Sequence, residues 1–365
     1  MTGPEPHSWV NKLDVYVGGK SKVAGVDHVI KLSSNESPFG PSQKAVDAYI
    51  KAADSLRRYP DGASLDLREA IGAAHGLDPE QIICGLGSDE ILKMACRAYA
   101  GPGDEVLYSR YGFMMYPIAA RAVGATPVEA PDKDFVADVD AILARVTDRT
   151  KIIFLANPNN PTGTYMPRAE VERLVQGLPE TVLLVLDAAY AEYVTRADYE
   201  AGDKLVDAYP NVIMTRTFSK LYGLAALRLG WGYSTPEIIS VLNRMRDPFN
   251  VTTAAQVAGA AALADHGFVE QALAHNNHWL PLLTERLEDL GLEVVPSVTN
   301  FVLVRFPEKH GITAEGANNH LTANGVILRW LPGQGLGDCL RMTVGLDEEN
   351  ERALGLLEDY IKERS

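Results

Sequence analysis

The sequence predicts an α/β protein in which a large domain, built on a mostly parallel central sheet, is joined to a smaller α+β domain. Through the middle of the chain, apolar β-branched runs alternate with amphipathic runs, which is typical of strands and helices that follow one another in a parallel sheet. The last third changes to a long amphipathic run followed by short strand-like runs. With 365 residues, the chain is also too long for one small hydrophobic core.

The middle of the chain supplies the elements of the predicted large domain. The predicted strands cover 104–109, 125–130, 151–156, 181–187 and 211–218, and the predicted helices cover 88–100, 113–124 and 168–178. The strands are apolar on both faces, as expected of a sheet that helices cover on both sides.

The last third supplies the predicted smaller domain. Helices are predicted over 272–292 and 346–364, and strands within 293–306, 325–331 and 340–346. The run 262–277 is typical of one continuous helix that connects the two domains, which puts their boundary near 265–280. The spaced glycines of 333–338 stand between two predicted strands and indicate a loop.

Composition and charge exclude several classes of protein. The net charge is −14, so a nucleic acid, which needs a basic surface, is not an expected partner. The sequence has no run of eighteen apolar residues and its first residues lack the pattern of a signal peptide, so we expect no membrane partner and a cytoplasmic location. Cys84, Cys96 and Cys339 lack metal-ligand spacing, which predicts buried thiols and no metal site.

Polar side chains stand at the ends of predicted strands, at the edge where ligands bind in open α/β sheets. Ser88 and Asp89 follow glycines and begin a helix, where free N–H groups suit a phosphate, although both residues are also ordinary helix N-caps. Asp187 ends a very apolar strand. Its carboxylate would be partly desolvated and would need a cationic partner, with a helix N-cap as the alternative.

Two further strand ends carry polar groups. In NPNNPTG, at 157–163, two prolines and a glycine fix a rigid turn that can aim the Asn160 amide at a ligand, with a plain loop as the alternative. Ser219 and Lys220 end the strand 211–218. A desolvated lysine shifts its pKa readily and becomes a nucleophilic amine, whereas a lysine taken alone is more often part of a surface ion pair. No P-loop or dinucleotide-binding glycine motif stands between a strand and a helix.

Taken together, these motifs resemble the fold-type I pyridoxal-phosphate (PLP) aminotransferases. NPNNPTG, then D-x-x-Y from Asp187, then S-K at Lys220 and R-x-G from Arg228 match that class in order and spacing, and the resemblance covers essentially the whole chain. The finer motifs LSSNESPFGPS, RRYPDG, LGSDEIL, SRYGFMMY and CLRMTVG are similar to the histidinol-phosphate aminotransferase family.

The resemblance implies a homodimer that transfers an amino group between L-histidinol phosphate and 2-oxoglutarate, with PLP as its cofactor. It implies a large PLP-binding domain over 41–270 and a small domain formed by both chain ends, 1–40 and 271–365. Histidine biosynthesis is the process that such an enzyme serves.

For the reacting end of the cofactor, the resemblance implies a role for each of five residues. Lys220 would bind PLP covalently and then move the proton between the donor's Cα and the cofactor. Asp187 would pair with the ring nitrogen, while Tyr190 and Asn160 would hydrogen-bond the ring's 3′ oxygen. Tyr111 would stack on the ring, with an ordinary core aromatic as the alternative.

The resemblance also implies residues for the anionic groups. Tyr59 would reach the cofactor phosphate of the other subunit. Arg341 would clamp the donor's anionic end, and Arg329 would be a second contact unless it forms a surface ion pair. Tyr16 and Asn35 would close the donor pocket. Within each chain, the phosphate of that chain's own PLP would be held by Gly87, Ser88, Asp89, Thr217, Ser219 and Arg228.

The segment 330–338 departs from the plainer loop expected between the two arginines. Trp330 adds an aromatic surface near the predicted donor pocket, so an enzyme for phenylalanine and tyrosine, alone or with dual specificity, is an alternative. A phosphothreonine decarboxylase of similar fold is another, and it would need no keto-acid acceptor. A PLP-sensing DNA-binding regulator is a third, which the negative charge opposes.

Overall fold

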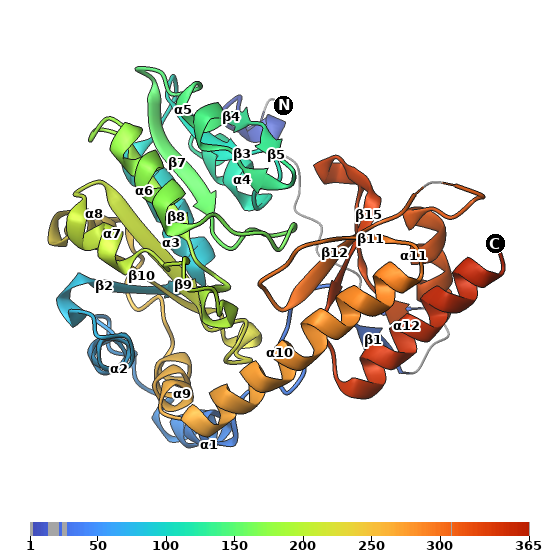
Figure 1. The fold of residues 1–365 in the computed structure, drawn as a ribbon. Coiled ribbons are helices and arrows are strands. Elements are labelled where there is room, and N and C mark those ends of the chain that lie inside the picture. The colour runs from blue at the N-terminus through green and yellow to red at the C-terminus, as the bar shows by residue number, and fades with distance from the viewer. Residues whose placement is uncertain (1–2, 14–21, 24–27, 308, 365) are drawn as a thin grey trace.

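A seven-stranded sheet forms the centre of the large domain (Figure 1). The computed structural model describes residues 3–13, 22–23, 28–307 and 309–364. The strand order is β2-β10-β9-β8-β7-β3-β4, and only β10 runs antiparallel to its neighbours within this sheet. The strands are β2 (Ile82–Leu86), β3 (Glu105–Ser109), β4 (Thr126–Ala130), β7 (Thr150–Ala156), β8 (Leu183–Asp187), β9 (Val212–Thr217) and β10 (Leu229–Ser234).

Helices cover both faces of this sheet, which explains why its strands are apolar on both sides. On one face Phe154 packs among side chains from α3 (Ser88–Tyr99), α4 (Met115–Ala122) and α8 (Pro236–Met245). On the other, Leu155 packs among side chains from the remaining helices of the domain. These are α1 (Gln43–Lys51), α2 (Leu65–His75), α5 (Val139–Leu143), α6 (Arg168–Gly177), α7 (Asp203–Ala208) and α9 (Thr253–Leu263).

A four-stranded antiparallel sheet, of order β11-β12-β15-β14, forms the smaller domain. Leu32 belongs to the hydrophobic core of this domain, and the short strand β1 beside it pairs in parallel with β13, so a segment from the start of the chain completes the fold of its end. The elements are β1 (Ile30–Lys31), β11 (Glu293–Val295), β12 (Phe301–Arg305), β13 (Val326–Ile327), β14 (Arg329–Leu331), β15 (Leu336–Thr343), α11 (Ala314–Ala323) and α12 (Asp347–Lys362).

The long helix α10 (His266–Asp289) runs from the α1 and α9 end of the large domain to the small domain (Figure 1). The prediction of one unbroken helix over 262–277 was wrong, because α9 ends at Leu263 and α10 begins at His266. Asp265 leaves the helical conformation between them, and its carboxylate pairs with Lys44 Nζ at 3.2 Å.

The other predicted strands and helices are confirmed with shifted ends, except that the strand predicted within 325–331 is divided into β13, which pairs with β1, and β14, which pairs with β15. Two strands of the large sheet, β2 and β10, were not predicted. The segment 333–338 is only partly a loop, since Leu336 already belongs to β15. The three cysteines are buried and free, as predicted. Within the described ranges, no helix has both the length and the apolar character that a bilayer span requires.

Candidate active site

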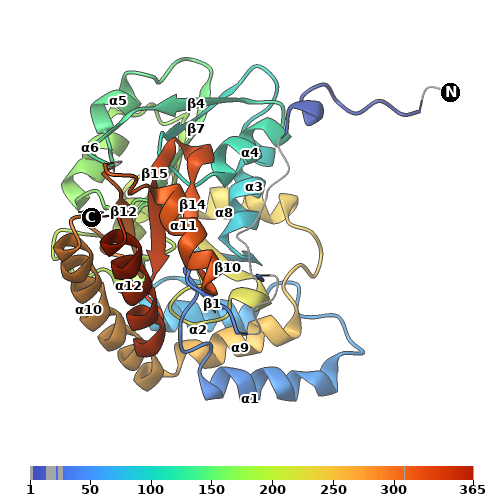
Figure 2. The ribbon, with the colours of Figure 1, turned by 90° about the vertical axis from the view of Figure 1, so that its right-hand side faces the viewer.

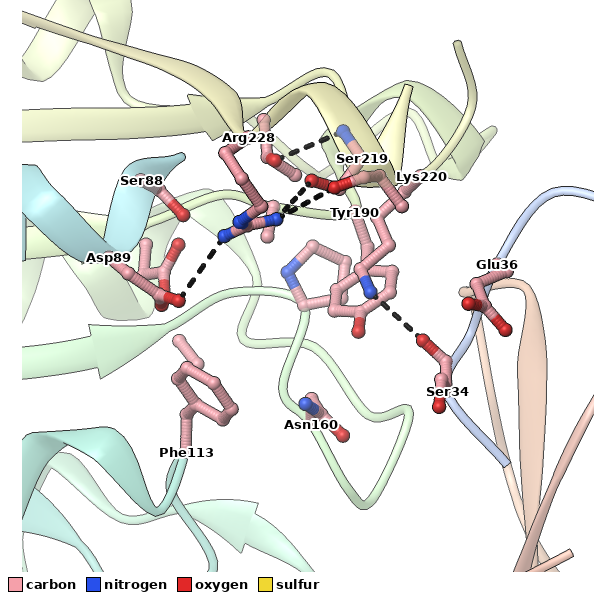
Figure 3. A pocket seen from close by; sticks show the side chains of 16 residues that line it. Ser34, Glu36, Ser88, Asp89, Phe113, Asn160, Tyr190, Ser219, Lys220 and Arg228 are labelled. Atoms are coloured by element: carbon pink, nitrogen blue, oxygen red, sulfur yellow. Dashed lines mark hydrogen bonds and ion pairs between the residues drawn. The ribbon is translucent and has the colours of Figure 1, made fainter. Parts of the chain in front are cut away.

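Residues from four strand ends meet around one cavity of about 240 Å³ (Figure 3). Ser88 follows β2, Asn160 follows β7, Asp187 ends β8 and Lys220 follows β9. The sequence placed polar groups at these strand ends, and the fold brings them together. The cavity wall is formed by Ser34, Glu36, Ser88, Asp89, Phe113, Ala156, Pro158, Asn160, Asp187, Ala189, Tyr190, Thr217, Ser219, Lys220, Ala225 and Arg228.

A second cavity of about 150 Å³ adjoins the first on the side of the small domain. Five residues line both cavities: Ser34, Phe113, Asn160, Tyr190 and Lys220. The remaining wall of the second cavity comes from Ser33, Asn35, Met114, Arg329, Leu331, Gln334 and Arg341. The two cavities therefore form one site with a polar cradle at one end and two arginines at the other.

Lys220 lies where the two cavities join. Its Nζ donates a hydrogen bond to the Ser34 carbonyl at 3.1 Å and lies 5.7 Å from the centroid of the Tyr190 ring. Burial, with a smaller contribution from the Arg341 cation, lowers the pKa of Lys220 to about 8. Near pH 7 roughly a tenth of the molecules of an amine with this pKa are neutral, far more than at its ordinary pKa, so it can act as a nucleophile or a base.

Asp187 is buried at the end of β8 with two hydroxyl donors on its carboxylate. Tyr116 Oη donates to Oδ2 at 3.0 Å and Thr215 Oγ1 donates to Oδ1 at 3.1 Å. Burial raises the pKa of Asp187 to about 6, although both hydrogen bonds act to lower it. A desolvated carboxylate held in a fixed orientation is suited to a cation or a protonated ring nitrogen.

The cradle at the far end of the first cavity is built for an anion. Arg228, in the left-handed region at φ +54°, has its guanidinium 3.4 Å from Ser219 Oγ and 3.6 Å from Asp89 Oδ2. Helix α3 begins beside it at Ser88, where no described side chain caps the helix, and the dipole at a helix N-terminus favours negative charge. A Cβ on Gly87, at φ +76°, would lie 2.6 Å from Arg228 Nη2, so this position requires glycine.

Thr217 lies in the same wall, and its hydroxyl accepts a hydrogen bond from the Ser219 N–H at 3.1 Å. The geometry therefore gives Thr217 a part in orienting the cradle.

Hydrogen bonds join the two domains across the second cavity. Arg341, which is 7% exposed, donates to Asn160 Oδ1 and to the Ser33 carbonyl, the latter at 2.6 Å. Asn35 Nδ2 donates to the Tyr190 hydroxyl at 2.8 Å. Burial raises the pKa of Tyr190 to about 12. These contacts fix the side chains of Asn160 and Tyr190 on the wall that they share with Lys220.

The structure places Tyr111 away from the cavity wall where the prediction expected it. Tyr111 lines neither cavity among the described residues; its ring stacks on Phe135, with centroids 5.6 Å apart, and packs against small-domain side chains. Phe113, two residues further on, lines both cavities. The tight turn between β3 and α4 reverses which of these two rings faces the site.

Two other positions that the structure describes, Tyr59 and Trp330, lie outside the two cavities. Tyr59 is 81% exposed and stacks on Phe249, with centroids 4.7 Å apart. Trp330 lines neither cavity; its indole N–H donates to the Gly337 carbonyl at 2.8 Å and so braces the loop between β14 and β15. The expected aromatic surface near the donor pocket is therefore absent from that wall. Tyr16 lies outside the described residues.

Several residues of the site were not predicted. Tyr116 and Thr215 hold Asp187, and Gln334 lines the second cavity. A signal existed for Thr215, because it stands two residues before Thr217 and therefore on the same face of β9. No local pattern distinguishes Gln334 from other polar loop residues.

Comparison with known proteins gives the same result at the level of the family. Residues 27–357 match the family described as aminotransferase class I and II. The chain is 55% identical over 361 residues to histidinol-phosphate aminotransferase of Paramagnetospirillum magneticum, covering 99% of each chain. It is 52% identical to the protein of that name from Rhodospirillum rubrum, covering 98% of this chain and 97% of that one.

Solved structures agree. The crystal structure of histidinol-phosphate aminotransferase from Sinorhizobium meliloti in complex with pyridoxal-5′-phosphate has a TM-score of 0.91 and 30% identity, covering 100% of this chain and 99% of that one. A Thermus thermophilus aspartate aminotransferase mutant, at 24% identity, 92% coverage of each chain and a TM-score of 0.80, shares the fold. From these matches over nearly its full length, the chain belongs to the class I and II aminotransferases and, within them, to the histidinol-phosphate aminotransferase family.

Proposed function

We propose that this protein is a PLP-dependent enzyme that transfers the amino group of L-histidinol phosphate to 2-oxoglutarate, giving imidazole acetol phosphate and glutamate in histidine biosynthesis. The observation that carries this proposal is the order of groups along the joined cavities. An anion cradle and a buried carboxylate lie on one side of Lys220, and Arg341 lies on the other. The names of relatives at 52–55% identity support the donor and the reaction.

The residues of the first cavity fit PLP. The cradle of Arg228, Ser219 and the α3 N-terminus offers donors for its phosphate, and Asp187 offers a buried carboxylate for its ring nitrogen. When bound, PLP supplies an electron sink that makes the Cα–H bond next to an amino group acidic. The S. meliloti relative, which was crystallised with PLP, supports this assignment.

Lys220 both anchors the cofactor and moves the proton. Its lowered pKa increases the share of neutral amine, which would hold PLP through its aldehyde carbon with loss of water and, once released, would accept the Cα proton of the donor. Asn160 and Tyr190 would hydrogen-bond the ring's 3′ oxygen, and Phe113, which lines the cavity where Tyr111 does not, would be the aromatic wall against the ring. Tyr116 and Thr215 keep the Asp187 carboxylate in orientation.

The second cavity receives the donor. Arg341 clamps its anionic end, and Arg329, opposite Arg341 on the neighbouring strand β14, is a second contact. Asn35 holds the Tyr190 hydroxyl and closes the pocket from the N-terminal segment. When 2-oxoglutarate is the substrate, the same arginines bind a carboxylate.

The domain limits, 41–270 against 1–40 with 271–365, remain part of the proposal. The burial of Leu32 in the small-domain core supports the inclusion of an N-terminal segment. The first described residues support a small-domain segment that starts later than residue 1, because Trp9 lies against the large domain. A Cβ on Gly124 of the large domain would lie 3.1 Å from the Trp9 ring.

We further propose a homodimer in the cytoplasm. Exposed apolar side chains gather on α1, α2, α9 and the segments beside them, which lie together at one end of the large domain (Figure 2). Exposed apolar side chains grouped on neighbouring elements are typical of an interface. A second copy on this face would bring Tyr59 toward the partner's cradle, and the buried free thiols fit a reducing compartment. The exposed apolar residues in this region are Tyr49, Ile50, Leu56, Tyr59, Leu65, Phe249 and Val257.

The test of the proposed function is a comparison of kcat/KM for histidinol phosphate, phenylalanine and tyrosine, each with 2-oxoglutarate and saturating PLP. We expect a clear preference for histidinol phosphate. Equal or higher values for the aromatic amino acids would instead identify an aromatic aminotransferase, and turnover without a keto acid would identify a decarboxylase.

A further inference from the structure

The loop between β14 and β15 carries a side chain that the proposed function leaves without a role. Gln334 lines the second cavity, and its Oε1 is buried without a hydrogen-bond partner among the described residues. A buried amide oxygen that accepts no hydrogen bond is costly, so its partner is expected to come from a bound molecule.

The loop that carries Gln334 is held at both ends. Leu331 and Leu336 pair across β14 and β15 and are both buried, in a cluster that also contacts Tyr111 and Phe135 of the large domain. The indole N–H of Trp330 fastens the loop to the Gly337 carbonyl at 2.8 Å. Gln334 is therefore presented to the cavity by a braced hairpin.

The other amide and carboxylate oxygens of the donor pocket already accept bonds. Asn160 Oδ1 accepts from Arg341, and Asn35 Oδ1 accepts from the Thr343 hydroxyl at 3.1 Å. Glu36, at the edge, pairs with Lys31 at 2.8 Å. Of these oxygens, Gln334 Oε1 is the one left to accept a bond from the substrate.

The Ser33 hydroxyl in this wall is also buried without a hydrogen-bond partner among the described residues, and the carbonyl of the same residue accepts a bond from Arg341. Because Ser33 contacts Arg341, we expect its hydroxyl to bind the anionic group of the donor together with the arginines. Phe113 and Met114 supply an apolar surface between the two ends, against which a flat ring can lie.

We infer that Gln334 reads the donor's ring by accepting a hydrogen bond from an imidazole N–H, and so selects an imidazole over a phenyl ring. This inference rests on the proposed function. A phenyl ring offers no donor, so it would leave the buried oxygen unpartnered, which is the usual origin of discrimination in such a pocket. Specificity then comes from the one loop that departs from the simpler pattern expected of the family.

The test compares two donors that share the amine and the phosphate and differ only in the ring: histidinol phosphate and 2-amino-3-phenylpropyl phosphate. For Gln334→Leu, we expect kcat/KM for histidinol phosphate to fall about tenfold, the usual effect of losing one such bond, while the value for the phenyl compound stays the same or rises. Gln334→Met, which keeps the length of the side chain, should change kcat/KM for the two donors in the same way.

Gly333→Ala is the matched control in the same loop. A Cβ at Gly333 meets nothing within 4 Å, so both values should stay at the wild-type level. The visible absorbance of bound PLP checks that each variant is folded and loaded.

An equal loss for both phosphorylated donors in Gln334→Leu would assign the side chain to the phosphate and overturn the inference, as would no loss at all. A wild-type enzyme that prefers histidinol phosphate, with an unchanged ratio in the variants, rejects the role of Gln334 and leaves the proposed function intact. A wild-type enzyme that does not use histidinol phosphate rejects both.

Discussion

At the scale of single residues, the chemistry of the site depends on three ionisable side chains that are buried close together: Lys220, Asp187 and Arg341. Burial lowers the pKa of Lys220 and raises that of Asp187, so both groups are shifted toward their neutral forms before any ligand arrives. Arg341 adds to the shift of Lys220. Perturbed groups of this kind, gathered in one cavity, are typical of catalytic sites.

Replacing Lys220 with alanine should remove the covalent attachment of PLP and slow transamination by about a thousandfold, within the range for loss of a general base. The visible spectrum of the purified protein and single-turnover rates measure both effects. Lys204→Ala is the control, since Lys204 is exposed at the start of α7. Substantial residual turnover in Lys220→Ala would contradict the role given to this amine.

The pH dependence of cofactor loading tests the pKa of Lys220 directly. The neutral amine is the attacking form, so the rate at which the cofactor-free protein takes up PLP should rise with pH through about 8 and level off above it. Arg341→Ala removes a cation that lowers this pKa, so its midpoint should move to higher pH. Stopped-flow absorbance gives both curves, and a midpoint near the ordinary value of 10.5 would refute the shift.

Most of the cofactor residues proposed here could be selected from the sequence, because each stands at a strand end and belongs to a motif of fixed spacing. Tyr111 and Phe113 show the limit of that method. Both are aromatic and two residues apart in a turn, and only the three-dimensional path of the turn decides which ring lines the cavity. The same holds for Gln334, whose role depends on an oxygen left unpartnered by tertiary packing.

At the scale of elements, β10 shapes the anion cradle although it supplies none of the cradle's side chains. Gly230 pairs with Gly85 of β2 and with Thr217 of β9. A Cβ on Gly230 would lie 2.2 Å from the Ser88 backbone nitrogen. The strand therefore lets the start of α3 approach only because this position lacks a side chain.

Gly230→Ala should force the start of α3 away from Arg228, at a cost of about 1–3 kcal/mol, and raise the Kd for PLP by about tenfold or more. Gly232→Ala is the matched control on the same strand. Its new Cβ would meet neighbours no closer than 3.4 Å, so PLP affinity should be nearly unchanged. Fluorescence titration of the cofactor-free proteins measures both values, and equal affinities for the two variants would contradict this account of β10.

Glycines explain both the close approach of α3 to β10 and the failure of the sequence to predict β2 and β10 as strands. β10 and β2 contain glycines at the positions where other strands carry β-branched residues, so their sequences have a weak strand signal. For Gly230, close contacts with Gly87 and Ser88 require the glycine. The sequence likewise did not predict the helix break at Asp265, because the apolar periodicity typical of a helix continues on both sides of this residue.

At the scale of the whole molecule, the proposed homodimer would make Tyr59 a link between catalysis and assembly. In one chain its ring is exposed and stacks on Phe249, within the apolar surface proposed to bind a second copy. If Tyr59 serves the partner's cofactor, each complete site takes Lys220 from one chain and Tyr59 from the other.

Mixing Lys220→Ala with Tyr59→Ala under conditions that exchange subunits should therefore restore activity at limiting PLP, toward about a quarter of the wild-type level for random pairing. Mixing Lys220→Ala with Asp187→Ala is the control, because both lesions fall in a chain's own cavity and no mixed pair has an intact site. Rates measured before and after exchange report the outcome, and no gain in the first mixture would place Tyr59 outside the partner's site.

The pairing of β1 with β13 has a consequence for the biosynthesis of the chain. Ser33 and Arg341, joined by a hydrogen bond, are 308 residues apart, whereas every strand that carries the PLP cradle has been translated by Ser234. As the nascent polypeptide leaves the ribosome, the cradle's sheet can form first, while Leu32 waits without a core until β13 and β15 emerge. The half of the site that binds the cofactor is thus encoded ahead of the half that selects the donor, and specificity is the last property the growing chain acquires.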